Sequence, residues 1–183
     1  MTNTEDSGAR ILGTLQVADG MGVVRLEDRL DATSDEVWAA LTQPARLAQW
    51  YGRVDGDLRR GGQLHTYIEA DDVEGTGRVE VCEPPRRLVV TTRETDESYA
   101  RGEGAPPHDT TDDVTATPVS KQTDLVVEVR GLPLEPIAFY GAGWQIHLEH
   151  LADHLAGREQ GEVESRWSEL VPHYQDLAAA ILR

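Results

Sequence analysis

Three histidines in the segment GWQIHLEHLADHLAG, residues 143–157, have a spacing that could support chemistry. His147, His150 and His154 follow one another at intervals of three and four, so on an α-helix they lie along one side. A pair with this spacing can ligate zinc when a third ligand completes the site. However, His147 and His154 would lie about 10 Å apart along the helix axis, so the helix cannot bring three imidazoles to one ion. We therefore predict no metal site and no cofactor.

The apolar residues of the same segment predict the buried face of this helix. At about 100° per residue, one narrow arc contains Trp144, Leu148, Leu151 and Leu155. The histidines form a stripe beside this arc, and His147 is nearest to it. We expect the apolar arc to pack on a sheet, with His147 at the edge of any cavity and the helix ending at Gly157.

Other motifs that would carry catalysis are missing from the sequence. There is no GXSXG nucleophile elbow and no P-loop. The single cysteine, Cys82, lies in the strand-like stretch GRVEVCEPP, where we expect a buried or half-buried thiol. We assign no catalytic residue, and the sequence favours a non-enzymatic protein without deciding the question.

The charge of the chain limits its partners. Seventeen basic and 33 acidic residues give a net charge of −16, which would repel nucleic acid because binding to a phosphate backbone depends on Lys and Arg. No apolar run approaches the roughly 20 residues of a membrane helix, so we expect no membrane insertion. The polar, acidic start MTNTEDSGAR does not resemble a signal peptide. We therefore expect a cytoplasmic protein.

The first half of the chain predicts a strand pair followed by two short helices. ILGTLQV and MGVVRLEDRLDA read as strands joined by a turn. Asp28 falls on the apolar face of the second strand, so it is either a polar group in a cavity or the site of a bulge. TSDEVWAALTQ predicts a helix capped by Thr33 or Ser34, and PARLAQWYG a second helix beginning at Pro44.

The middle of the chain predicts an antiparallel meander. The strand-like stretches DGDLRR, QLHTYIEA, EGTGRVEVCE and RRLVVTTRE are separated by turn signals such as GG and PP. Val79 and Val81 alternate with charged residues, as expected for a sheet with one solvated face.

Residues 95–110 form a polar stretch that is either a mobile lid or a solvated insertion. DDVTATPV and TDLVVEVRGL predict a last hairpin. The C-terminal stretch ESRWSELVPHYQDLAAAILR reads as helical around a break at Pro172.

This order of elements resembles the helix-grip fold of the START-like (SRPBCC) superfamily, in its branch related to the activator of heat-shock-protein ATPase. The resemblance runs across roughly residues 22–157 and is carried by the stretches VVRLEDRLDATSDEVWAALTQPARLAQWYG, GDLRRGGQL, GTGRVEVCEPPRRLVVTT, TDLVVEVRGL and GWQIHLEHLADHLAG. RWSELVPHY resembles a tail found on many bacterial members. The resemblance implies an α+β domain in which a curved antiparallel sheet grips a long C-terminal helix, with an apolar cavity between them.

Three functions follow as expectations from this resemblance. The first is a non-enzymatic domain that binds a hydrophobic or amphipathic small molecule. The second is a chaperone- or regulator-interacting module with a protein partner, although the chain has no room for the extra N-terminal domain of the eukaryotic co-chaperone. The third is an enzyme of the cyclase or hydratase kind. The candidate cavity residues are Asp28, Trp50, Val79, Val90, Thr92, Val127, Trp144, His147, Leu148 and Leu151.

The expected organisation is one domain with two terminal additions. We predict a disordered N-terminus over residues 1–9, the helix-grip domain over residues 10–157, and a helical extension over residues 158–183 that packs on the same domain.

Overall fold

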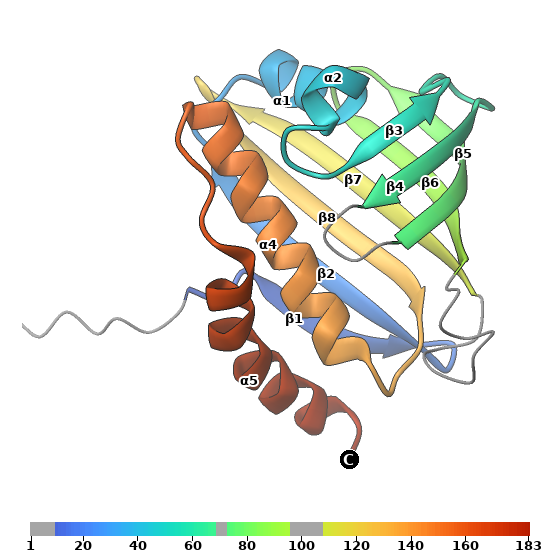
Figure 1. The fold of residues 1–183 in the computed structure, drawn as a ribbon, viewed down its shortest axis with the longest axis vertical. Helices are drawn as coiled ribbons and strands as arrows, with labels where there is room; N and C mark the ends of the chain where they lie inside the picture. Colours follow the sequence, from blue (N-terminus) through green and yellow to red (C-terminus); the bar gives the residue numbers. More distant parts are fainter. Residues whose placement is uncertain (1–9, 69–72, 96–107) are drawn as a thin grey trace, which may run out of the picture.

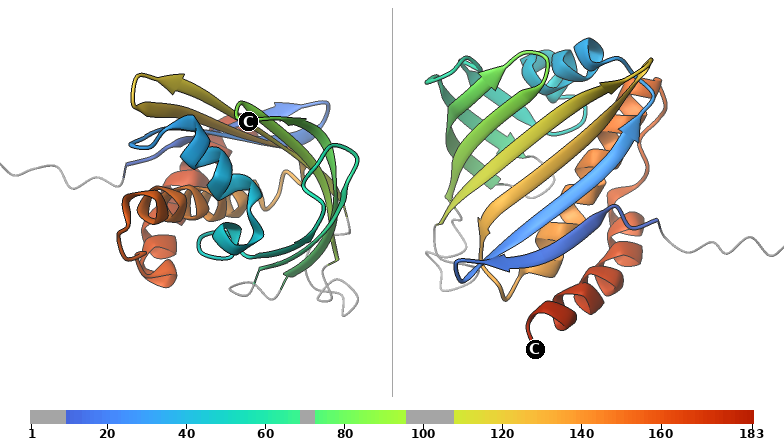
Figure 2. Two further views of the ribbon diagram at one scale, coloured as in Figure 1. Left: turned by 90° about the horizontal axis from the view of Figure 1, so that it is seen from above. Right: turned by 180° about the vertical axis from the view of Figure 1, so that it is seen from behind.

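A single antiparallel sheet and a long helix dominate the computed structural model, which describes residues 10–68, 73–95 and 108–183. Within these residues, eight strands are ordered β1-β2-β8-β7-β6-β5-β4-β3. The sheet curves, and helix α4 crosses its concave face (Figures 1 and 2). The expected α+β helix-grip fold is therefore confirmed. The N-terminus predicted to be disordered and residues 96–107 of the predicted lid or insertion lie outside the described residues.

The elements follow the predicted order along the chain. The strands are β1 (Gly13–Ala18), β2 (Met21–Leu30), β3 (Arg53–Gly56), β4 (Gln63–Ile68), β5 (Val73–Glu83), β6 (Arg87–Thr95), β7 (Asp109–Val119) and β8 (Gln122–Leu132). The helices are α1 (Ser34–Thr42), α2 (Pro44–Leu47), α4 (Ile137–Ala156) and α5 (Val163–Ile181). The stretch DGDLRR is mainly a turn, because β3 begins earlier and ends at Gly56.

The β1–β2 hairpin turns tightly through Asp19 and Gly20, whose φ angles are 53° and 79°. Positive φ at both positions suits the right-handed twist of the two strands, and glycine adopts it without strain. Further along β2 the pairing with β8 is regular, and Asp28 lies opposite Leu125. The alternative of a bulge at Asp28 is therefore wrong, because the irregularity of β2 lies between Gly22 and Val23.

The two short helices close one end of the sheet (Figure 1). Thr33 caps α1 in a capping box: its hydroxyl accepts a hydrogen bond from the backbone N–H of Glu36, and the Glu36 carboxylate accepts one from the Thr33 backbone N–H. Pro44 begins α2, as predicted. After α2, the indole Nε1 of Trp50 donates to the carbonyl oxygen of Ala40 at 3.0 Å, which fixes Trp50 against α1.

A β-bulge in β5 changes which residues face the helix. Val79 pairs with Val90, but Val81 pairs with Val89, so Glu80 is the extra residue. Because neighbouring residues of β6 point to opposite faces, Val79 and Val81 do so too. The prediction that they share a face is therefore wrong. The bulge also turns Cys82 toward the apolar core, where it is half-buried and burial raises the pKa of its thiol.

The convex face of the sheet is polar and carries cross-strand ion pairs. Arg29 pairs with Asp124 at 2.6 Å, and Arg87 pairs with Asp113 at 2.7 Å. Exposed pairs of this kind contribute little stability each, but they keep this face solvated. Most of the buried apolar residues of the sheet lie on the concave face, toward α4.

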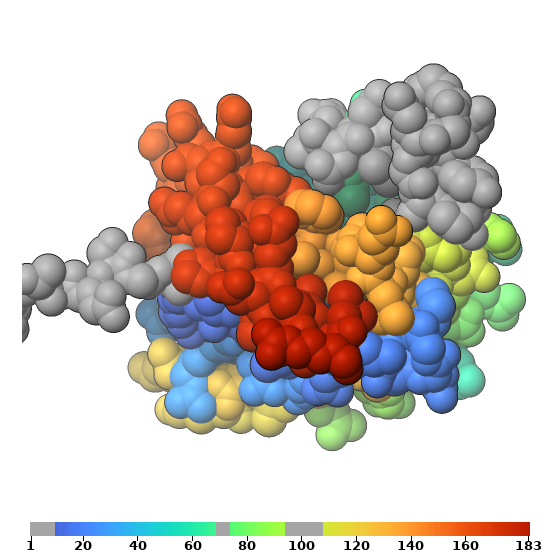
Figure 3. All heavy atoms as spheres, turned by 90° about the horizontal axis from the view of Figure 1, so that it is seen from below, coloured from blue at the N-terminus to red at the C-terminus, as the bar shows by residue number. Residues whose placement is uncertain are grey.

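Helix α5 packs against α4 and β1 on the side away from α1 and α2 (Figure 1). Figure 3 shows it lying between the visible parts of α4 and the β1–β2 hairpin. Its buried residues are Leu170, Tyr174 and Ala178, spaced four apart on one face. The predicted break at Pro172 is wrong: although proline cannot donate to the carbonyl four residues earlier, this packed face holds the helix continuous.

The burial of α4 is wider than one narrow arc. Leu148 and Leu151 are buried, whereas Trp144 and Leu155 are only partly buried. A second buried stripe, which includes Gly141 and Gln145, faces α5. None of the helices within the described residues is long and apolar enough to cross a membrane.

Candidate functional site: an apolar cavity between the sheet and helix α4

A cavity of about 80 Å³ lies between the concave face of the sheet and α4. Residues from α1, α2, the loops on either side of β3, strands β3, β4, β6, β7 and β8, and α4 contribute to its wall. The lining consists of Leu41, Leu47, Trp50, Tyr51, Val54, Leu58, Leu64, Thr66, Leu88, Val90, Thr92, Asp112, Val114, Leu125, Val127, Trp144, Leu148 and Leu151. Fifteen of these are aliphatic or aromatic, so the cavity favours apolar groups.

One wall of the cavity is aromatic. The ring centroids of Trp50 and Tyr51 are 5.6 Å apart, and those of Tyr51 and Trp144 are 6.0 Å apart, which is the usual range for attractive aromatic pairs. Tyr51 and Trp144 are partly exposed, whereas Trp50 is buried. Tyr51 and Trp144 therefore form the part of the wall that is closest to solvent.

The sheet wall is built from cross-strand rows. Val127 of β8 lies opposite Val114 of β7 and, on its other side, Leu26 of β2. In the next row Asp112 of β7 lies opposite Val90 of β6 and Val129 of β8. Residues directly opposite one another share a face, so these rows present a nearly continuous apolar surface to α4 that one acidic side chain interrupts.

The polar lining residues come from the strands β4, β6 and β7. They are Thr66, Thr92 and Asp112. The hydroxyl of Thr92 lies 2.7 Å from that of Thr110 on the neighbouring strand, a buried hydrogen bond in which either can donate. The Oδ1 atom of Asp112 is buried. These groups give the sheet side of the cavity a polar character that the aromatic wall lacks.

The structure places most of the residues predicted from sequence around this cavity. Those that line it are Trp50, Val90, Thr92, Val127, Trp144, Leu148 and Leu151. Trp50 is the exception to the sheet and α4 pattern, since it comes from the segment after α2. All the others lie on the concave face of the sheet or on α4.

The other three predicted residues lie outside the lining. Val79 is fully buried, and it belongs to the packed core beside the cavity. His147 is half-buried behind the aromatic wall, with its ring centroid 5.1 Å from that of Tyr51. Asp28 accepts from Arg10, whose Nη2 lies 2.6 Å from its Oδ1, so it is tied to the chain before β1.

The other two histidines of the α4 stripe, His150 and His154, lie in different surroundings. The Arg46 Nε donates to His154 Nε2 at 3.4 Å, and burial, followed by the nearby Arg46 charge, lowers the pKa of His154. His150 lies in a polar groove between α4 and α5 with Glu149 and Arg166. The stripe seen in the sequence is therefore divided among three environments.

Two polar residues of the interior were not predicted from the sequence. Asp112 could have been found, because Asp112, Val114 and Ala116 alternate in phase along the predicted strand DDVTATPV. No pattern in the sequence indicated that Gln145 is buried, because a glutamine beside the apolar arc of a helix is usually predicted to lie on the surface. It is 0% exposed.

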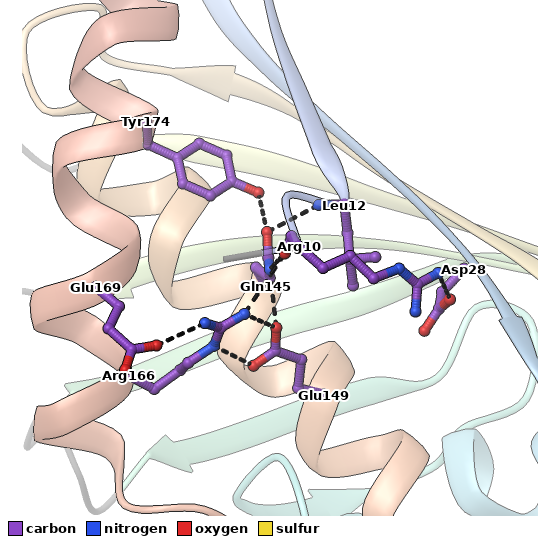
Figure 4. Close-up of polar contacts among 8 residues, drawn as sticks. All are labelled: Arg10, Leu12, Asp28, Gln145, Glu149, Arg166, Glu169 and Tyr174. Atoms are coloured by element: carbon purple, nitrogen blue, oxygen red, sulfur yellow. Dashed lines mark hydrogen bonds and ion pairs between the residues drawn. The ribbon is translucent and has the colours of Figure 1, made fainter. Parts of the chain in front are cut away.

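Gln145 joins the chain before β1 to α4 and α5 (Figure 4). Its Oε1 accepts from the backbone N–H of Leu12 at 3.0 Å and from the Tyr174 hydroxyl at 2.7 Å. Its Nε2 donates to the Arg10 carbonyl at 2.6 Å and to the Glu149 carboxylate at 2.8 Å. The amide thus satisfies both of its polar atoms inside the protein.

An ion pair continues this network at the surface. Arg166 of α5 binds both carboxylate oxygens of Glu149, through Nε at 2.8 Å and Nη2 at 2.7 Å, and its Nη1 donates to Glu169 at 2.8 Å (Figure 4). Hydrogen bonding to Glu149 raises the pKa of the Arg166 guanidinium. A bidentate pair fixes direction as well as distance, so it holds α5 in register on α4.

Tyr174 occupies a position that two glycines make available. A Cβ atom on Gly13 of β1 or on Gly141 of α4 would collide with its side chain. The ring is 0% exposed, and burial raises the pKa of its hydroxyl. Tyr174 thus contacts β1 and α4 together, and this network is structural in character and separate from the cavity.

Comparisons with known proteins agree with the fold. CalU16 from Micromonospora echinospora is 25% identical to this chain; its crystal structure superposes with a TM-score of 0.68 over 91% of this chain and 96% of CalU16. Its solution structure gives a TM-score of 0.70 over 96% and 99%. Comparison with curated protein sequences finds no match.

A third similar structure has a longer chain. DynU16, a protein in the dynemicin biosynthetic locus, is 26% identical, with a TM-score of 0.64 over 77% of this chain. The match spans 50% of DynU16. The family model "Activator of Hsp90 ATPase homolog 1-like protein" matches residues 31–156. This range contains α1, α2, the strands β3 to β8, α4 and every lining residue of the cavity, but neither β1 nor β2. The chain therefore belongs to the family of activator of Hsp90 ATPase homolog 1-like proteins.

Proposed function

We propose that this chain binds an apolar or amphipathic small molecule in the cavity between the sheet and α4, and releases it unchanged. The observation that carries the proposal is the lining: 15 of its 18 residues are apolar or aromatic, and the three polar ones lie together on the sheet side. Apolar burial would supply most of the affinity, at about 25 cal/mol per Å² of ligand surface. The polar groups would orient the ligand.

The size of the cavity implies that it widens on binding. Its volume of about 80 Å³ is smaller than the roughly 150 Å³ that admits benzene in an engineered protein. Pockets for larger organic ligands measure about 300–1,000 Å³. Tyr51, Leu58 and Trp144 are partly exposed lining residues, so we expect their side chains to rotate outward when a ligand enters.

The setting of one similar structure supports a small organic ligand. DynU16 belongs to a biosynthetic locus, where a binding domain would meet intermediates or products of small-molecule synthesis. By this analogy the ligand of the present chain is an organic metabolite, and the chain acts where such metabolites are made, in the cytoplasm. Fold analogy limits this step to the class of ligand.

A fluorescent probe tests the proposal. N-phenyl-1-naphthylamine is neutral and gains fluorescence in apolar surroundings, so its titration reports cavity binding. Val127→Phe fills the cavity from the sheet side, and we expect it to abolish the fluorescence gain. Val126→Phe is the matched control, because residue 126 of β8 faces the convex side, where it pairs with Glu27 and Thr115.

Two measurements keep the outcome interpretable. Thermal melts followed by circular dichroism verify that both variants fold, since overpacking costs about 1–3 kcal/mol. If folded Val127→Phe binds the probe as well as the Val126→Phe variant does, the probe is not in the cavity and the proposal is wrong. Native mass spectrometry of protein purified from its own host then identifies the natural ligand and whether its mass changes on incubation.

A further inference from the structure

Two threonine side chains form a hydrogen-bonded pair on the sheet side of the cavity. Thr92 of β6 lies opposite Thr110 of β7, and their Oγ1 atoms are 2.7 Å apart. Both residues are buried, and of the two it is Thr92 that lines the cavity. The pair therefore places one of its two hydroxyl-bearing residues in the cavity wall.

Strand pairing fixes the orientation of the Thr92 side chain. On its other side Thr92 lies opposite Gly77 of β5. A Cβ atom placed on Gly77 would be 3.1 Å from Cγ2 of Thr92, so the methyl group is directed toward β5 while the hydroxyl is directed toward Thr110 of β7. Val90 and Thr92, two residues apart on β6, share the concave face. Thr92 thus holds its hydroxyl at a defined place beside the apolar lining.

The two hydroxyls have one more donor than their shared hydrogen bond uses. Each threonine supplies one O–H group, and the bond between them uses one of the two. Within the described part of the chain, this is the only side-chain hydrogen bond that either threonine makes. If Thr110 donates, the O–H group of Thr92 remains to donate at the cavity wall. If Thr92 donates, its oxygen still has a lone pair that accepts.

We propose that Thr92 selects ligands that carry an uncharged oxygen, a hydroxyl or a carbonyl, while their apolar part fills the cavity. This proposal rests on the proposed function and adds the polar group of the ligand. A buried O–H group without a partner costs free energy, and a ligand oxygen that accepts from it removes that cost. The described lining residues include no Lys, Arg or His, so a ligand carboxylate would be buried without a counter-ion, which costs more than burying a neutral oxygen.

Three probes with the same carbon skeleton separate these cases. Ethylbenzene has no polar atom, acetophenone has a carbonyl that accepts, and 1-phenylethanol has a hydroxyl that donates and accepts. Each is titrated into the protein while the methyl NMR signals of Val127 and Leu148, which line the cavity, report its entry. Comparing the three affinities between wild type and a variant removes the differences that arise from the hydration of the probes themselves.

Thr92→Val and Thr110→Val remove the same hydrogen bond, but only Thr92→Val removes a hydroxyl from the cavity wall. We expect Thr92→Val to weaken the binding of acetophenone and 1-phenylethanol about tenfold relative to ethylbenzene, which corresponds to about 1.4 kcal/mol. Thr110→Val is the matched control and should keep the wild-type ratios. Thr92→Ser keeps the hydroxyl without the methyl group and should keep them as well. Circular dichroism melts verify that each variant folds; if Thr92→Val does not, Thr92→Ala replaces it in the same comparison.

The outcomes distinguish this proposal from the one on which it rests. If the probes shift the cavity methyl signals and Thr92→Val leaves the relative affinities unchanged, the hydroxyl contact is overturned while cavity binding stands. The same holds if Thr92→Val and Thr110→Val lower the relative affinities equally, because the effect then arises from the lost hydrogen bond between the strands. If no probe shifts these signals in the wild type, both proposals fail. A loss in Thr92→Val that Thr110→Val and Thr92→Ser do not share supports the assignment.

Discussion

Truncation of Leu148 should weaken the fold and open the cavity at the same time. Leu148 of α4 is 3% exposed and lines the cavity. Leu148→Ala removes three carbons, worth about 0.8 kcal/mol each in transfer energy, or about 2.4 kcal/mol. The enlarged cavity adds a further cost, and Leu→Ala changes in cores total about 2–5 kcal/mol. We expect the free energy of unfolding to fall by about 3 kcal/mol, because Leu148 already borders the cavity and has fewer packing contacts to lose.

Ligand binding should change in the opposite direction. In the variant, a ligand can occupy the space left by the leucine side chain and recover up to about 2 kcal/mol of apolar burial, a factor of about 30 in affinity. Titration with N-phenyl-1-naphthylamine measures this gain, and urea denaturation followed by circular dichroism measures the loss of stability. The melting temperature should fall by roughly 6–12 °C for 3 kcal/mol in a chain of this size.

Leu170→Ala provides the matched control. Leu170 of α5 is 0% exposed and belongs to the core, but it does not line the cavity. The same chemical change should therefore cost stability, toward the upper end of the range, with no gain in probe affinity. Equal gains in both variants, or no gain in Leu148→Ala, would show that the space beside Leu148 is not the binding site.

The remaining predictions concern the elements that hold the site in place. Tyr174→Phe should lower the free energy of unfolding by about 1–2 kcal/mol, because it removes a buried hydrogen bond to Gln145. Burial raises the pKa of the Tyr174 hydroxyl in the folded protein above its unfolded value of 10.0, so only the wild type should lose stability as the pH rises above about 10. The difference between the urea midpoints of the two proteins should therefore shrink at high pH. Thr33→Ala should cost about 1 kcal/mol by removing the α1 cap, whereas Ser34→Ala should change the melting temperature little. Gly141→Ala should push the Tyr174 side chain out of its position against α4, and the packing energy lost should exceed the helix propensity that alanine gains. We expect a lower melting temperature. An unchanged melting temperature would contradict the packing described.

Local patterns along the chain were sufficient to predict most of the fold. The alternation in β2 and β8 and the apolar arc of α4 reflect short-range periodicity that the sequence displays directly. The cap of α1 was narrowed to Thr33 or Ser34, and the structure shows Thr33. The bulge at Glu80 was not predictable, because one extra residue shifts the face of everything after it without changing the composition of the strand. The continuous helix through Pro172 depends on burial of Tyr174 against β1 and α4, which is a long-range contact.

The candidate site was predictable only in part, because local alternation predicts which face a residue lies on but not which distant residues it contacts. Val90, Val127, Leu148 and Leu151 reach the cavity because strand and helix alternation place them on the inner face. Asp28 obeys the same alternation, but Arg10 from the chain before β1 binds it away from the cavity. The aromatic wall depends on Trp50 and Tyr51, which were predicted to belong to the second helix but follow the end of α2 at Leu47. Tyr51 was not among the candidates.

The central claim is that the cavity beside α4 binds a small apolar or amphipathic ligand, and methyl NMR during titration with N-phenyl-1-naphthylamine tests it most directly. The methyl groups of Val90, Val127 and Leu148 should shift progressively and saturate, while those of Leu170 stay in place. Shifts confined to residues on the outer surface of α4 and α5, such as those around Trp167, with Val127 and Leu148 unchanged, would contradict it.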